Sequence, residues 1–121
     1  MTTKILCVDD NPADLKNLQR IIATQNLLSV TASSGAEAIA KARAEKPNLI
    51  LMDIIMDGMD GFNTCRELRK DTELSAIPIV FVSSKNQKAD HMWAAKQGAK
   101  ALISKPYSDA DILNQITALV G

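Results

Sequence analysis

Residues 48–61 read NLILMDIIMDGMDG, an apolar run that ends in an aspartate and continues into two Asp-Gly pairs. A continuous run of Leu, Ile and Met is typical of a strand covered on both faces, as in a parallel sheet. Such strands rarely contain carboxylates, so Asp53 at the end of the run needs a reason to be there. Asp57 and Asp60, each followed by glycine, have the composition of turns, which leaves Asp53 as the carboxylate with a chemical role.

Apolar runs of the same kind recur on both sides of this stretch and alternate with segments of helical periodicity. Strict alternation of strand and helix predicts a three-layer α/β sandwich around a five-stranded parallel sheet. The five strand–helix units use the whole chain, so we expect one domain. The predicted strands are residues 4–9, 27–32, 48–53, 77–82 and 100–104.

Capping residues mark the ends of the predicted helices. On the fourth helix we expect Ala89, Met92 and Ala95 to face the core, and Trp93 to point toward the fifth strand and fifth helix. The predicted start and stop signals are Asn11-Pro12, Ser34 with Glu37, Ser108 with Asp111, and Gly98 after the fourth helix.

The bulk composition limits the possible partners. Of 121 residues, 14 are Lys or Arg and 14 are Asp or Glu, which argues against general affinity for nucleic acid or an anionic membrane surface. No apolar run approaches the roughly 20 residues of a membrane span, and the N-terminus lacks a signal-peptide pattern. Cys7 and Cys65 lack metal or redox spacing, so we expect both to be small buried residues of a cytoplasmic protein.

Polar residues follow four of the predicted strands: Asp9 and Asp10 the first, Asp53 the third, Ser83 the fourth and Lys105 the fifth. Because the carboxyl ends of parallel strands meet at one edge of a sheet, we expect these side chains to converge. Three converging carboxylates repel one another and raise one another's pKa values unless a cation neutralises them. Oxygen ligands with open positions suit Mg²⁺, and a lysine adds the positive charge that phosphate recognition uses.

Four motifs stand after their expected strands: VDDNP (8–12), LMDIIMDGMDG (51–61), VSS (82–84) and KP (105–106). Together they resemble the receiver domains of two-component response regulators, of the CheY-like chemotaxis type. The resemblance covers the whole chain and implies a flavodoxin-like, doubly wound sheet. It also implies one receiver domain over residues 1–121, without an output domain. Residues 85–106 look especially like the single-domain receivers of twitching-motility (type IV pilus) systems.

The resemblance implies that Asp53 takes a phosphoryl group from the phosphohistidine of a histidine kinase. Asp10, Asp53 and the backbone carbonyl of Ile55 would bind Mg²⁺ directly, and Asp9 would act through a metal-bound water. The protein would then be no enzyme in the usual sense, because it catalyses only its own phosphorylation and dephosphorylation.

The same resemblance assigns the remaining site residues. Ser83 would hydrogen-bond the phosphoryl group, Lys105 would pair with its oxygens, and the bond between Lys105 and Pro106 would be cis. A small inward movement of Ser83 would change the surface that partners bind. The implied partners are the kinase and an unknown output protein, with no nucleic acid and no membrane, and we expect a monomer or a weak dimer.

Four positions depart from the pattern of the family. Leu102 replaces the aromatic residue that moves with the hydroxyl group in many relatives, which argues against that readout here. Asp57 stands where proline is common, which predicts a more mobile loop. Ile55 is apolar and Lys85 is basic, at positions thought to tune the lifetime of the phosphoryl group.

Three other functions remain open at this point. A phosphatase of the haloacid dehalogenase class also uses Asp and Mg²⁺, but it normally needs a second Asp where this chain has Ile55. A flavin-binding module would need a phosphate loop after the first strand, and DDNPAD (9–14) is acidic. The third alternative keeps the fold and makes the protein an unphosphorylated docking module. Within the receiver interpretation, the protein is a signal carrier or a phosphate sink.

Overall fold

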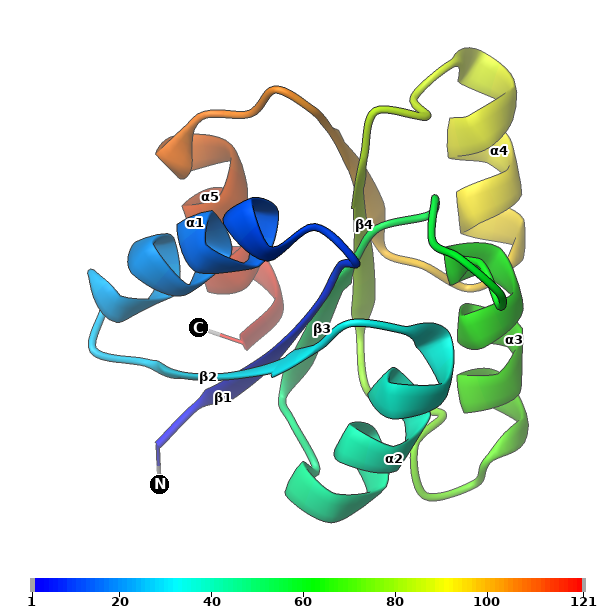
Figure 1. Ribbon diagram of the computed structural model, residues 1–121, viewed down its shortest axis with the longest axis horizontal. Helices are drawn as coiled ribbons and strands as arrows, with labels where there is room; N and C mark the ends of the chain where they lie inside the picture. Colours follow the sequence, from blue (N-terminus) through cyan, green and yellow to red (C-terminus); the bar gives the residue numbers. More distant parts are fainter. Residues whose placement is uncertain (1, 121) are drawn as a thin grey trace.

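Five parallel strands form the middle layer of the computed structural model, which describes residues 2–120 (Figure 1). Their order is β2-β1-β3-β4-β5, so β2 lies on one side of β1 and the later strands lie on the other. This is the doubly wound, flavodoxin-like topology that the resemblance to receiver domains implied. The strands are β1 (Lys4–Val8), β2 (Leu28–Ala32), β3 (Leu49–Met52), β4 (Ile79–Ser83) and β5 (Ala101–Ser104).

The observed strands agree with the predicted ones except at their ends. The largest difference is in β4, which begins at Ile79 and not at residue 77. Pro78 has no amide hydrogen to donate to a neighbouring strand, which explains the later start. At its other end β4 includes Ser83, which is opposite Ser104 of β5. The hydroxyl residue of the site is therefore part of the sheet and is fully buried.

Helices cover both faces of the sheet (Figure 1). Helices α1 and α5 lie on one face, and α2, α3 and α4 lie on the other. Within residues 2–120, no helix has the length and apolar character needed to cross a bilayer. The helices are α1 (Pro12–Ala23), α2 (Gly35–Glu45), α3 (Gly61–Lys70), α4 (Lys88–Lys96) and α5 (Asp109–Val120).

Each face of the sheet has its own hydrophobic core, because successive strand residues point to opposite faces. In β1, Leu6 and Val8 pack with α2, α3 and α4, whereas Ile5 and Cys7 pack with α1 and α5. Cys65 belongs to the core between the sheet and helices α2, α3 and α4. Both cysteines are buried, as predicted, and burial raises the pKa of the Cys7 thiol to about 12.

Most of the predicted helix signals are confirmed. The Asn11 side chain accepts a hydrogen bond from the amide of Ala13 at 2.9 Å, and Gly98 has the left-handed φ of 92° expected after α4. Ser108 and Asp111 exchange both bonds of a capping box. Ser34 accepts from the Glu37 amide, but the Glu37 carboxylate bonds the amide of Ser33, one residue before the expected donor.

The prediction for α4 was wrong. Ala94 is the buried residue of this helix, whereas Ala89, Met92 and Ala95 are exposed, Met92 at 65%. Trp93 lies toward α3 and not toward β5 and α5, as the edge contact of its ring with Phe62 of α3 shows. Alanines occur on several sides of α4, so spacing alone does not choose between competing stripes, and the packing of the helix decides.

Candidate functional site

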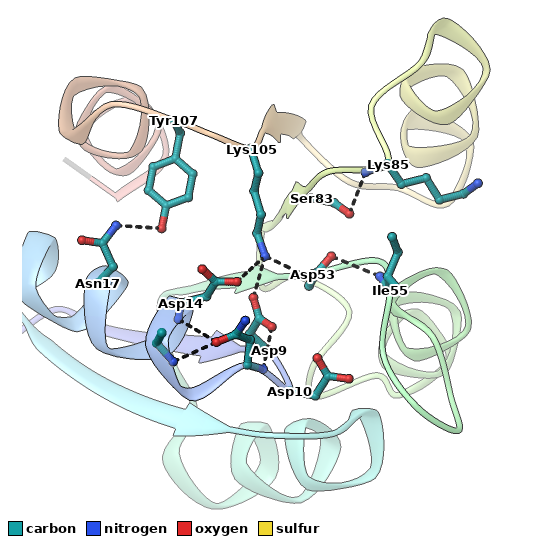
Figure 2. A network of polar contacts seen from close by, with 12 residues as sticks. Asp9, Asp10, Asp14, Asn17, Asp53, Ile55, Ser83, Lys85, Lys105 and Tyr107 are labelled. Carbon is teal, nitrogen blue, oxygen red and sulfur yellow. Dashed lines mark hydrogen bonds and ion pairs between the residues drawn. The ribbon is translucent and has the colours of Figure 1, made fainter.

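The backbone of the sheet places three of the predicted residues side by side. The amide of Asp9 bonds the carbonyl of Ala32, and that of Asp53 bonds the carbonyl of Val8. The amide of Lys105 likewise bonds the carbonyl of Ser83, so all three residues extend the strand pairing by one step. Their side chains leave the carboxyl edge of the sheet together, and Figure 2 shows them pointing toward one another.

The ammonium of Lys105 is the centre of the site. Its Nζ lies 2.9 Å from Oδ2 of Asp9, 2.9 Å from Oδ2 of Asp14 and 3.0 Å from Oδ2 of Asp53 (Figure 2). A lysine ammonium has three hydrogens to donate, so these three carboxylates use its full capacity. Lys105 is the cation on which the neighbouring carboxylates depend.

Charge in this cluster is unbalanced. Asp9 and Asp53 are buried, and burial raises the pKa of Asp9, although hydrogen bonds from Lys105 and Asn11 lower it. Burial also lowers the pKa of Lys105, but the bonds to its three carboxylates outweigh this and leave the pKa above its usual value. The lysine therefore stays charged at neutral pH. Three carboxylates share one ammonium, and the excess negative charge favours a further cation.

Asp53 is held at the start of a tight loop. Its Oδ1 accepts a hydrogen bond from the amide of Ile55 at 3.1 Å. The loop closes at Gly61, whose amide bonds the carbonyl of Ile54 at 2.8 Å. A Cβ at Gly61 would collide with the carbonyl oxygen of Asp53 and with Ile54. Glycine is thus required for α3 to begin directly against the loop that carries Asp53, and Asp60 caps that helix through the amide of Asn63.

Asp10 lies beside this cluster and not within it. Its carboxylate is exposed and accepts a bond from the amide of Asp57 at 3.3 Å. In the part of the chain that the structure describes, no three Asp, Glu, His or Cys side chains are grouped as a metal-binding set. The donors available at this edge are nevertheless all oxygens, from the carboxylates of Asp9, Asp10 and Asp53. Hard oxygen donors of this kind fit Mg²⁺ better than a softer metal.

Ser83 and Lys85 lie on the β4 side of the site. The Ser83 hydroxyl accepts a bond from the Lys85 amide at 3.2 Å, so in this structure it is engaged with its own loop. The Lys85 ammonium pairs with Asp90 at 3.3 Å, and Figure 2 shows its side chain directed away from Asp53. The bond between Lys105 and Pro106 is cis, as predicted.

Two groups at the site were not predicted from the sequence. Asp14, in the first turn of α1, is the third partner of Lys105. Tyr107 follows Lys105 by two residues, and its hydroxyl accepts a bond from Asn17 of α1 at 3.2 Å. The signal in the sequence for Asp14 is its place in the first turn of a helix that begins directly after Asp9 and Asp10. Acids are also common in the first turn of a helix, so the residue type alone does not mark Asp14 as part of the site.

The sequence pattern of the response regulator receiver domain matches residues 5–117. The chain belongs to this family. This receiver domain is thus a phosphoacceptor signalling module of the two-component type, and family membership decides against the phosphatase and flavin-binding alternatives.

One relative supports that assignment, and two solved structures have the same fold. Protein PilH of Pseudomonas aeruginosa is 38% identical to the receiver domain over 117 residues, which cover 97% of each chain. The chemotaxis protein CheY4 of Vibrio cholerae has the same fold, with a TM-score of 0.93 at 22% identity over 99% of this chain and 100% of that one. The receiver domain of the P. aeruginosa sensor histidine kinase PA1611 has a TM-score of 0.91 at 21% identity, with coverage of 100% and 99%. That structure has a magnesium ion coordinated in its active site cleft.

Proposed function

We propose that Asp53 accepts the phosphoryl group and that a histidine kinase donates it. The observation that carries this proposal is the hydrogen bond between Lys105 and the Asp53 carboxylate, at the carboxyl edge of the sheet. In the transfer, an Asp53 oxygen bonds the phosphorus while the bond from phosphorus to the kinase histidine breaks. The imidazole leaves with the electron pair of that bond and takes a proton from water.

The residues around Asp53 suit this reaction, because phosphoryl transfer depends on positioning and charge neutralisation more than on covalent chemistry. The Ile55 amide orients the Asp53 carboxylate. Lys105 supplies positive charge to the transferred oxygens. The Ser83 hydroxyl accepts from the Lys85 amide and still has its own hydrogen to donate to the phosphoryl group. Asp53 thus combines the roles of nucleophile and carrier.

Asp10 and Asp53 would hold Mg²⁺ with the Ile55 carbonyl, and Asp9 would act through a bound water. When bound, Mg²⁺ supplies charge that neutralises the incoming phosphoryl oxygens. The exposed carboxylate of Asp10 supports this assignment, since the hydrogen bond that it accepts from the Asp57 amide is long, at 3.3 Å. Asp9 is buried against Lys105, which suits an indirect role.

The same proposal extends to the pathway. Similarity to PilH over nearly the whole chain, and the resemblance of residues 85–106 to twitching-motility receivers, favour pilus motility over chemotaxis. A phosphate sink is the alternative role within that pathway. The absence of an output domain, the monomeric or weakly dimeric state and the cytoplasmic location stay predictions.

Incubation with acetyl phosphate and Mg²⁺ tests the proposed function. We expect the intact protein to gain the mass of one phosphoryl group, and we expect chelation of Mg²⁺ to prevent that gain. An unphosphorylated docking module would gain none in either condition, and that result would contradict the proposal.

We expect the phosphorylated state to be long-lived for a receiver domain. We also expect that replacing Ile55 shortens the lifetime of this state. Hydrolysis needs a water in line with the Asp53 phosphoryl group. Ile55 is 55% exposed beside that position and offers no polar group to orient the water, while Lys85 is engaged with Asp90. Ile55→Asn should speed dephosphorylation on the order of tenfold, and Ile55→Val should leave it nearly unchanged. An equal or slower rate in Ile55→Asn would show that Ile55 is not the brake.

Trp93 is expected to report the occupancy of Asp53. Its ring packs edge-on against Phe62 at 6.5 Å between centroids, and Phe62 packs in the same way against Phe81 of β4 at 5.3 Å. Phe62 directly follows Gly61, which abuts Asp53. Beryllofluoride with Mg²⁺ should therefore change the Trp93 fluorescence, and Phe62→Leu should reduce the change. Constant fluorescence with binding confirmed by calorimetry would leave Trp93 as ordinary packing.

A further inference from the structure

The three carboxylates on Lys105 differ in how easily each can release it. The Asp9 side chain is 3% exposed and that of Asp53 is 10% exposed, whereas that of Asp14 is 36% exposed. Asp9 is also held by the amide of Asn11 at 2.9 Å. A buried carboxylate that loses its cation is strongly destabilised, because neither water nor a second cation replaces the lost charge. An exposed carboxylate can be hydrated instead.

Phosphorylation adds oxygens that need the same lysine. Because all three hydrogens of the Lys105 ammonium are already used, a bond to a phosphoryl oxygen requires one carboxylate to let go. One hydrogen can pass from the Asp53 carboxylate to the phosphoryl group attached to it, and a second bond to that group requires Asp9 or Asp14 to release the lysine. Of the other two, Asp14 is released at the smaller cost.

The surroundings of Asp14 give its side chain room to move. A hollow of about 440 Å³ lies between the start of α1 and the chain that follows β5. Lys105 and Asp14 both line it, so a released carboxylate would enter this hollow and not a packed core. The hollow is lined by Asp14, Asn17, Ser84, Lys105, Pro106 and Tyr107.

We propose that Asp14 is a positioning residue that competes with the phosphoryl group for Lys105. This inference rests on the proposed function of Asp53 and Lys105. In the unphosphorylated protein, Asp14 holds the ammonium toward α1. On phosphorylation it gives up the bond, and the freed hydrogen of the ammonium turns to a phosphoryl oxygen while Asp9 keeps its bond. Asp14 thereby favours the unphosphorylated state and sets how tightly the site holds an anion.

The first test measures beryllofluoride affinity in the presence of Mg²⁺. Asp14→Asn keeps the size of the side chain and removes its charge. We expect this variant to bind beryllofluoride about fivefold more tightly than the wild type, which is the upper end of what a partly exposed ion pair contributes. Asp14→Glu keeps the charge and should bind beryllofluoride with the affinity of the wild type. Asp109→Asn is the matched control, because this exposed acid pairs with Arg20 and not with Lys105.

A double-mutant cycle separates competition for the lysine from simple repulsion of the anion. In a Lys105→Gln background, Asp14→Asn should have little effect, because the bond in question is already absent. An equal gain in both backgrounds would mean that Asp14 acts by repulsion, and it would overturn the proposal. Unchanged affinity in Asp14→Asn, with the wild type binding normally, would also overturn it. No binding by the wild type would contradict the proposed function instead.

A second measurement needs no metal. The ¹³Cε signal of Lys105 should shift in Mg²⁺-free Asp14→Asn and should not shift in Asp109→Asn. A merely structural role of Asp14 would lower the melting temperature without this pattern. An unshifted Lys105 signal would show that Asp14 does not hold the ammonium in solution, and the proposal would fail.

Discussion

Asp53→Asn is expected to abolish phosphorylation, with a loss of at least about 1000-fold in the rate of labelling by acetyl phosphate, as for removal of other essential nucleophiles. Asparagine has nearly the same shape, and its oxygen can still accept from the Ile55 amide. It lacks the anionic oxygen that attacks phosphorus. The expected result therefore follows from chemistry and not from loss of the fold.

The matched variants for this experiment are Asp57→Asn and Asp60→Asn. Both acids lie in the same loop as Asp53, and neither side chain contacts Lys105: Asp60 caps α3, and Asp57 contributes its backbone amide. Both variants should be labelled like the wild type. Melting temperatures should be measured alongside, since Asp53→Asn alters the charges around Lys105. Full labelling of Asp53→Asn would remove Asp53 from the role of acceptor.

Asp10→Ala is expected to weaken Mg²⁺ binding by at least about tenfold, because each anionic oxygen ligand contributes strongly to a hard cation site. The Asp10 carboxylate is exposed and free of Lys105, so its removal should cost little stability. This separates a metal effect from a folding effect. Binding can be followed by calorimetry, and phosphorylation should fall in parallel.

Asp57→Ala is the control for the Mg²⁺ experiment. It preserves the backbone amide that donates a hydrogen bond to Asp10. It removes the negative charge of the Asp57 side chain, which lies near the site but is not an expected Mg²⁺ ligand. We expect only a small change in Mg²⁺ affinity. Equal affinity of Asp10→Ala and the wild type would rule out direct ligation by Asp10, and an equally large loss in Asp57→Ala would show a general field effect.

Much of the fold could be predicted because its signals are local. Each strand is a short run of neighbouring apolar residues, and each correctly predicted cap lies within a few residues of the group that it binds, as Ser108 and Asp111 do. The α4 prediction failed because local residue patterns do not show which face of this helix meets the core. Its residues offer more than one apolar stripe, and contact with Phe62 and the sheet selects the stripe that contains Ala94.

The sequence by itself determined the parallel sheet and the convergence of Asp9, Asp53 and Lys105, because strand ends of a parallel sheet share one edge. Its doubly wound order followed from the resemblance of the motifs to receiver domains. Only the tertiary structure decided what these groups bind. Asp14 and Lys105 are 91 residues apart, and their ion pair depends on how α1 packs against the chain after β5. Asp10 likewise meets the Asp57 amide across 47 residues. Such partners depend on packing between elements distant in the chain, and local residue patterns do not specify that packing.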